Sequence, residues 1–185
     1  ILAVAPGAVG LPDALYTGLV SLTRRGNGGY TLAISGRARV DPTPQQFRFG
    51  REFLPMFARR WRSLAPGGFE GWRQGHESLT KWALDGATPM ERNRILDPKP
   101  DMGQIRLTHQ RACDLLPELR RVAISDVWAG YIDSTPDGIP AIGEVESIPG
   151  FMLAAGFSGH GFGIGPGTGH MIADIITGRA PIVDP

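Results

Sequence analysis

Strand-forming residues cluster in two short runs near the start of the chain, with a glycine-rich turn between them. Leu19–Thr23 and Tyr30–Ala33 are the two runs, and Gly26–Gly29 separates them. Such a pattern predicts an antiparallel hairpin. Ala38–Val40 is a candidate third strand.

A helix start follows these strands. In the segment Asp41–Pro44, Thr43 stands at the N-cap position and Pro44 at the first helical position. Large apolar residues then recur at roughly helical spacing over 47–61, and Pro55 is expected to bend or shorten that helix.

A second helix is predicted over Gln104–Leu116, directly before the helix breaker Pro117. It contains Cys113, the one cysteine of the chain. Because no activating pattern surrounds this residue, we expect a buried structural thiol rather than a nucleophile. A lone cysteine also excludes a disulfide framework and a cysteine metal cluster.

The last third of the chain predicts three strands, a loop and a helix. The strands are Val122–Tyr131, Ala141–Gly143 and Phe151–Ala155, of which the last two are expected to be buried. Gly156–Gly165 is predicted to be a loop, and Pro166–Thr177 a helix with Pro166 in its first turn. The whole pattern indicates an α+β fold.

Charge divides the chain in the same region. Between Val122 and Gly178 there is no Lys or Arg, against six acidic residues, whereas residues 1–121 carry 18 of the 19 basic residues. We therefore place a boundary between residues 1–121 and 122–185. It separates either two layers of one fold or two domains.

Composition excludes several classes of protein. A net charge of +1 gives no field that favours nucleic acid or a membrane surface. No apolar run reaches the length of a membrane span, and no signal peptide is visible, so a cytoplasmic location is expected. With 42% hydrophobic residues the chain can form a core despite its 26 glycines and 16 prolines. Its start in the style of a strand suggests a fragment of a longer protein.

Seven of the 26 glycines fall within residues 156–169. A glycine-rich loop that leads into a helix N-terminus suits an anion or a dipole, because free N–H groups point outward there. Neither a phosphate-loop Lys nor a complete GxGxxG is present, which argues against a self-contained Rossmann site. Two interpretations remain: the glycines let the backbone approach a flat ligand, or they form a tight strand-to-helix corner.

The polar residues outside this loop suggest little chemistry. His76, His109 and His170 lack metal-ligand spacing, so no metal site is predicted. The arginines of 59–62 and 120–121 are typical of solvated helix faces rather than of a nucleic-acid site. A serine hydrolase is disfavoured because no G-x-S-x-G elbow exists.

Four motifs in order carry a resemblance to a known family. They are Trp128–Gly130, Thr135–Gly143, the loop 156–166, and its helix through Gly178. This series resembles the C-terminal part of the D-amino-acid-oxidase-like flavoenzymes, the group of glycine oxidase, sarcosine oxidase and dimethylglycine dehydrogenase. The resemblance implies that 1–121 is a partial substrate domain with a mainly antiparallel sheet and flanking helices. Residues 122–185 would then complete an FAD-binding domain, while the N-terminal Rossmann half is absent.

The resemblance also implies a function. The chain would be the C-terminal portion of an FAD-dependent oxidoreductase that oxidises the C–N bond of an amino acid or a secondary amine by hydride transfer to flavin. Alone it would be incomplete and inactive, with the missing Rossmann half as its partner and an electron acceptor that stays open. The alternative is a non-catalytic substrate-domain fragment, or a partner-binding subunit without FAD.

Site residues follow from the same resemblance. The cofactor-binding candidates that would line the pyrimidine side of the flavin are Gly159, His160, Gly161, Phe162, Gly163 and Ile164. Of these, His160 matches a histidine near the sarcosine oxidase flavin and is the catalytic candidate. Gly130 stands where sarcosine oxidase has the cysteine that bonds FAD, so noncovalent FAD is expected.

Departures from the family pattern refine these expectations. Gly163 and Ala33 stand where sarcosine oxidase has lysines, one beside the flavin and one that activates oxygen; a dehydrogenase is therefore favoured over an oxidase. Ile132, with Asp133 beside it, occupies the place of the arginine that grips the substrate carboxylate in glycine oxidase and D-amino-acid oxidase. Another arginine, with Arg37 and Arg39 as candidates, would hold the carboxylate, or the substrate is a different amine.

Overall fold

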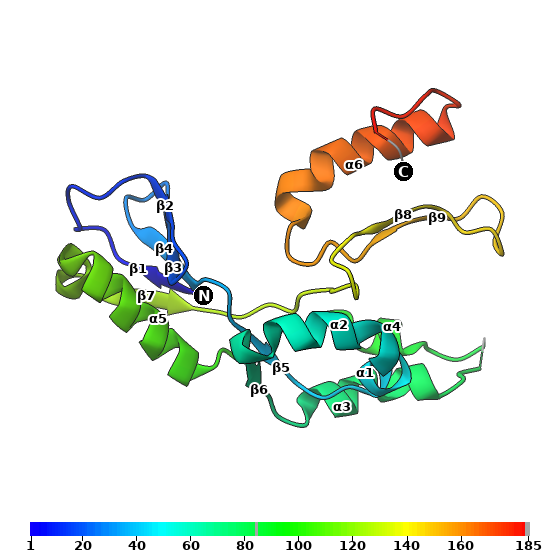
Figure 1. Cartoon of the computed structure of the whole chain (residues 1–185), viewed down its shortest axis with the longest axis horizontal. Coiled ribbons are helices and arrows are strands. Elements are labelled where there is room, and N and C mark those ends of the chain that lie inside the picture. Colours follow the sequence, from blue (N-terminus) through cyan, green and yellow to red (C-terminus); the bar gives the residue numbers. More distant parts are fainter. Residues whose placement is uncertain (84, 184–185) are drawn as a thin grey trace. The chain divides into compact units, whose positions relative to one another are not determined.

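A computed structural model describes residues 1–83 and 85–183, with the side chain of His76 left out (Figure 1). The described chain forms two compact units. Unit 1 comprises Ile1–Phe47 and Arg60–Tyr131, and unit 2 comprises Arg48–Arg59 and residues 132–183. Each unit is described by itself below.

The helices and strands of the first half are β1 (Leu2–Val4), β2 (Ala14–Tyr16), β3 (Val20–Arg24), β4 (Tyr30–Ile34), β5 (Ala38–Val40), α1 (Pro44–Arg48), α2 (Gly50–Arg60), β6 (Leu64–Pro66) and α3 (Glu70–Gly75). The second half adds α4 (Pro89–Arg92), α5 (Met102–Leu115), β7 (Ile124–Val127), β8 (Ala141–Glu144), β9 (Met152–Ala155) and α6 (Gly161–Ile176). Short 3-10 turns occupy Trp61–Ser63, His76–Leu79 and Pro117–Arg121.

An antiparallel sheet of five strands, in the order β2-β3-β4-β1-β7, forms the centre of unit 1. The predicted hairpin is confirmed, since β3 and β4 pair with Leu22 opposite Leu32. Strand β1 inserts between β4 and β7, although these elements are far apart in the sequence. The expected mixed fold with a mainly antiparallel sheet is therefore confirmed.

Helix α5 covers one face of this sheet (Figure 1) and completes the core. Its buried residues Ile105, Thr108, Ala112 and Cys113 recur at helical spacing. They pack with fully buried side chains from the strands, namely Leu2, Val4, Val20, Leu22 and Leu32. Asp101 caps the helix, because its Oδ1 accepts the N–H groups of Gly103 and Gln104 at 2.8 and 3.1 Å.

The third predicted strand exists but leaves the main sheet. Strand β5 pairs in parallel with β6, with Ala38 opposite Leu64. Gly36, at φ 63°, lies in the turn between β4 and β5, a conformation that favours glycine. The chain thereby changes direction before the third strand begins.

The helix predicted over 47–61 consists of two helices. Thr43 starts α1 as expected, since its Oγ1 accepts the Gln46 N–H and the Gln46 side chain accepts the Thr43 N–H. The chain then breaks between α1 and α2 at Phe49, rather than at Pro55, which lies inside α2.

Unit 2 contains the antiparallel hairpin of β8 and β9 and the helix α6 (Figure 1). These two strands were expected to be buried, which is wrong, because none of their residues is buried. Helix α6 begins at Gly161, five residues before its predicted start, so Pro166 lies inside it. Gly165 precedes this proline, and its missing Cβ removes the clash that usually ends a helix there.

The two units separate between Tyr131 and Ile132, ten residues beyond the boundary in composition at 121/122. The physical reason is the strand β7, which pairs with β1 and so ties residues 124–127 to the sheet of unit 1. Of the predicted strand Val122–Tyr131, only these four residues form strand.

Candidate functional site

The loop between β9 and α6 is held in a conformation that most residues avoid. Gly156, Ser158 and Gly159 have φ values of 77°, 51° and 88°. A Cβ added at Gly156 would collide with the side chain of Thr135. Glycine is therefore required at this position for both conformation and space.

A second segment, residues 133–135, clamps this loop from one side. The Asp133 carboxylate accepts the Gly156 N–H at 2.6 Å, and the Asp133 carbonyl accepts the Ser158 N–H at 2.8 Å. The Ser158 Oγ donates to the Gly156 carbonyl at 3.2 Å and lies 3.3 Å from the Thr135 N–H. Hydrogen bonds to a charged acceptor are stronger than neutral ones, so Asp133 is the main anchor of the loop.

The loop leads into the N-terminus of α6, a helix of 16 residues. His160 is its N-cap residue, and the His160 carbonyl accepts the N–H groups of Gly163 and Ile164 at 3.0 and 3.2 Å. The N–H groups of Gly161 and Phe162 find no acceptor among the described residues. Together with the positive end of the helix dipole, these two donors form a site for negative charge.

The residues predicted from the sequence are partly brought together. Gly159 to Ile164 are contiguous, and a Cβ added at Gly159 would lie 3.7 Å from the side chain of Ile132. The Asp133 carboxylate contacts the loop, since one of its oxygens accepts the Gly156 N–H. Gly130, in contrast, belongs to unit 1 and is exposed.

Sequence reasoning missed Thr135 and Ser158. The available signal was chemical, since both are hydroxyl residues next to turn residues, and such side chains often bond to nearby backbone. Their pairing across 23 positions could not be predicted from local pattern.

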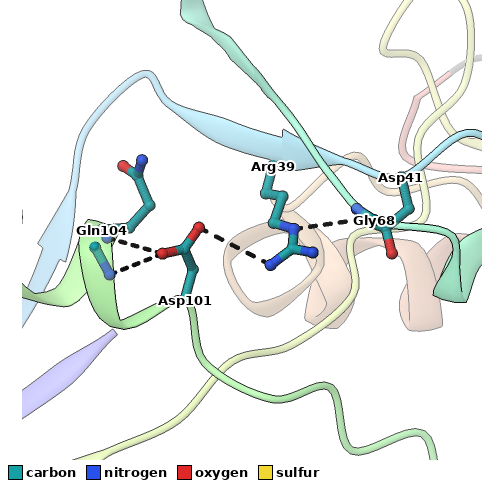
Figure 2. A network of polar contacts seen from close by, with 6 residues as sticks. Arg39, Asp41, Gly68, Asp101 and Gln104 are labelled. Carbon is teal, nitrogen blue, oxygen red and sulfur yellow. Dashed lines mark hydrogen bonds and ion pairs between the residues drawn. The ribbon is translucent and has the colours of Figure 1, made fainter.

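The two candidate arginines of unit 1 differ in their ion pairs. Figure 2 shows Arg39 between two carboxylates, with its Nε 3.3 Å from Asp41 Oδ1 and its Nη1 3.9 Å from Asp101 Oδ2. The Asp41 carboxylate also accepts the N–H groups of Gly68 and Gly71. Arg39 is therefore committed to these partners, whereas Arg37 makes no ion pair within residues 1–83 and 85–183.

Cys113 is buried and free, as expected from the sequence. Burial raises the pKa of its thiol, which disfavours the nucleophilic thiolate. The sulfur lies 3.6 Å from Nε2 of His109, one helical turn earlier. The helix therefore holds this thiol as a core residue.

In the parts that the structure describes, no group of three or more His, Cys, Asp or Glu side chains is arranged to hold a metal ion. None of the described helices has both the length and the apolar character needed to cross a membrane.

The geometry at α6 fits a flat cofactor that gains negative charge on one edge. Gly163 and Gly165 carry no Cβ, and an added Cβ at either would meet no atom within 4 Å of the described chain. The free N–H groups of Gly161 and Phe162 lie at the same helix end. The pyrimidine edge of an isoalloxazine ring is polar, so its polarity suits these donors.

Known proteins support this interpretation. Residues 27–175 match the family described as FAD dependent oxidoreductase, or DAO. Glycine oxidase from Pseudomonas putida is 30% identical over 149 residues, which are 79% of this chain and 38% of that enzyme. Glycine oxidase from Pseudomonas aeruginosa is 39% identical over 74 residues, which cover 40% of this chain and 20% of that enzyme.

A solved structure shares the fold. The L-amino acid deaminase from Proteus myxofaciens matches with a TM-score of 0.88 at 23% identity, over the whole of this chain and 41% of that one. The chain thus spans about two fifths of the length of the proteins that match most of it.

Proposed function

Because the chain belongs to the DAO family of FAD dependent oxidoreductases, whose cofactor is FAD, we propose that it is the C-terminal portion of an amino acid or secondary amine oxidoreductase. In this proposal, residues 132–183 complete an FAD-binding domain whose Rossmann half lies outside these residues. Unit 1 supplies most of the substrate domain. The observation that carries the proposal is the glycine loop at the N-terminus of α6 with two unpaired N–H donors.

Bound FAD would supply the chemistry by accepting a hydride from the carbon next to the substrate nitrogen. The residues of this chain would stabilise the negative charge that follows. The N–H groups of Gly161 and Phe162 would donate hydrogen bonds to it, and the α6 dipole would add to their effect. Fixed donors of this kind contribute about 3 kcal/mol each when they are aimed at a developing charge.

Several residues take supporting roles in this proposal. Asp133 holds the loop through the Gly156 N–H, and Ile132 and Gly159 form the wall beside it. His160, at the N-cap, is exposed, and its side chain makes no capping hydrogen bond, so it is available to the substrate or the cofactor. With Gly130 where a covalent cysteine would stand, FAD is held without a covalent bond.

We favour a dehydrogenase over an oxidase. Gly163 and Ala33 replace the two lysines that the resemblance associates with the flavin and with oxygen. Fast reoxidation of the reduced protein by oxygen would contradict this choice. We also propose that the protein is cytoplasmic, which fractionation of cells tests.

We propose Arg37 as the residue that binds the substrate carboxylate. Ile132 cannot hold it, and Arg39 is already neutralised by Asp41 and Asp101 (Figure 2).

The alternative proposal is a non-catalytic chain that binds a partner without FAD. The exposed side chains of unit 2 are compatible with it, since Phe162, Ile139 and Ile132 are uncovered.

The deciding experiment uses the full-length protein that contains this chain. We expect it to purify yellow, with the absorbance of flavin, and to lose that absorbance when an amino acid is added without oxygen. A protein that stays colourless after incubation with FAD would support the non-catalytic alternative.

A matched pair of variants tests the role of the helix end. Phe162→Pro removes one N–H but keeps the helix, because proline is tolerated in the first turn. Phe162→Ala removes the fully exposed ring and keeps the N–H. We expect flavin reduction to slow by about 10- to 100-fold in the first variant and by less than about threefold in the second.

A further inference from the structure

Three arginines of unit 1 line one cavity of about 270 Å³. They are Arg37, Arg62 and Arg111, and the polar residues Ser35 and Ser63 line the same cavity. No acidic residue is part of its lining. The three arginines come from separate parts of the sequence, so the fold itself creates this concentration of positive charge.

The strand pairing explains how these residues meet. Ala38 of β5 lies opposite Leu64 of β6, so the residues just before them, Arg37 and Ser63, come together at one end of this parallel pair. At the end of the β3–β4 hairpin, the Ser35 N–H donates to the Leu19 carbonyl at 3.1 Å. That bond fixes the residue from which the chain turns towards Arg37.

The third arginine comes from the helix that covers the sheet. Arg111 directly precedes the buried residue Ala112 on α5, and it is itself half-buried. Its position is therefore set by the packing of the helix on the core. Arg62 is fixed in a different way, since its guanidinium lies over the ring of Trp61 at 5.2 Å.

These three arginines differ from the arginines of unit 1 that form ion pairs. Arg24, Arg39 and Arg120 each lie within 4 Å of a carboxylate. Arg37, Arg62 and Arg111 have no carboxylate partner among the residues that the structure describes. Guanidinium groups keep their charge at all physiological pH values, so the three arginines that line this cavity offer unpaired positive charge to an anion.

A buried hydroxyl that lines the same cavity also indicates a ligand site. The Oγ atom of Ser35 is buried and has no hydrogen-bond partner in the described structure. Buried polar atoms in native proteins are nearly always paired, so an unpaired one that lines a cavity marks a place where a ligand or a water binds. The cavity thus offers both charge and an unused hydrogen-bonding group.

We propose that this cavity binds a small organic dicarboxylate. One carboxylate takes one guanidinium fork in bidentate fashion, and the second carboxylate takes another, because a single negative charge would leave two of the three cations uncompensated. The volume lies just below the roughly 300 Å³ at which pockets for drug-sized ligands begin, which suits a chain of a few carbons. The inference concerns residues of unit 1 alone and goes beyond the proposed function.

Calorimetric titration of the full-length, FAD-loaded protein tests this inference. Glutarate is the dicarboxylate probe, butyrate is the monocarboxylate probe, and inorganic phosphate tests for general anion binding. We expect glutarate to bind at least tenfold more tightly than butyrate or phosphate. Equal affinity for glutarate and butyrate, or tighter binding of phosphate, would overturn the proposal.

Variants then locate the site. Arg62→Gln and Arg111→Gln should each weaken glutarate binding by at least tenfold, and Arg111→Lys should fall between Arg111→Gln and the parent, because it keeps the charge but loses the fork. Arg94→Gln, which changes an exposed arginine outside the cavity, is the matched control and should change nothing. Glutarate binding that survives both cavity substitutions would contradict the assignment.

The two proposals fail in distinguishable ways. Glutarate carries no amine to oxidise, so its binding is measured without turnover. A protein that is bleached by neutral amino acids but does not bind glutarate would keep the proposed function and reject the dicarboxylate site. A protein that binds glutarate but is never reduced by any amine would reject the catalytic function and keep the site.

Discussion

Among the described residues, all the buried apolar side chains except Met171 lie in unit 1, whereas residues 132–183 contribute only that one from α6. Unit 1 buries leucines and valines from the three strands β1, β3 and β4 together with one face of α5. In unit 2, the hairpin of β8 and β9 exposes or half-exposes all its residues, and Phe162 is fully exposed. The two regions are thus stabilised differently.

This difference teaches how the chain divides its tasks. Unit 1 is stabilised by its own core, and it also carries the cavity lined by Arg37, Arg62 and Arg111. Unit 2 is stabilised by hydrogen bonds around glycines, such as that from Gly156 to Asp133, and it leaves apolar surface and N–H groups uncovered. In the proposed function, FAD and the Rossmann half cover that surface.

The largest effect should separate the two regions by stability. Leu32→Ala empties a fully buried position in β4 and should lower the free energy of unfolding by about 2–5 kcal/mol. Leu153→Ala makes the same change at a residue of β9 that is 37% exposed, and should cost less than about 1 kcal/mol. Urea unfolding of the chain, followed by circular dichroism, measures both. Equal losses would mean that unit 2 has a core of its own.

A second effect concerns two glycines with positive φ. Gly156→Ala in the full-length protein should weaken FAD binding by about 10- to 100-fold, because strain and a collision with Thr135 distort the loop. Gly28→Ala, at φ 83° in the β3–β4 turn, should lower stability but change the FAD dissociation constant by less than about twofold. Fluorescence titration measures the FAD dissociation constant of both variants. An equal loss of FAD affinity in both would contradict a specific role of Gly156 in the FAD site.

A third and smaller effect tests the anchor of the loop. Asp133→Asn keeps an oxygen that accepts the Gly156 N–H but removes its charge, which should cost about 1 kcal/mol and weaken FAD binding about fivefold. Asp137→Asn is the control, since that carboxylate accepts the Ile139 N–H in a neighbouring turn. If Asp137→Asn has the larger effect, Asp133 is no anchor.

A further test compares the exposure of the two regions through the reactivity of a thiol. Because Cys113 is buried and burial raises the pKa of its thiol, it should react with a disulfide reagent at pH 8 at least about 100-fold more slowly than in the unfolded chain. The rate should rise with pH, as the thiolate forms. A chain with Cys113→Ser and Ala154→Cys places the probe on exposed β9 and should react about as fast as a free thiol. Slow labelling at 154 would show that β9 is covered.

Much of this fold could be predicted from local signals in the sequence, whereas the pairing of distant segments could not. The β3–β4 hairpin and the cap at Thr43 depend on neighbours within a few residues, so pattern was sufficient. The pairing of β1 with β7 depends on residues more than 100 positions apart. The start of α6 was missed because Pro166 dominated the local pattern.

The same limit applies to the candidate sites. The glycine loop 156–161 is contiguous and was found from the sequence. The arginine cavity was not found, since Arg62 lies in a basic cluster that is typical of a solvated helix face. Only the register of β5 against β6 and the packing of α5 bring it near Arg37 and Arg111.

Hydrogen exchange of the full-length protein, with and without FAD, tests most directly whether residues 156–162 face the cofactor. We predict that amides of this loop and of the first turn of α6 exchange at least about tenfold more slowly when FAD is bound, because the N–H groups of Gly161 and Phe162 gain acceptors. Amides of β3 and β4 should be unchanged, since the core of unit 1 protects them already. Unchanged exchange in 156–162, with protection elsewhere, would contradict the account.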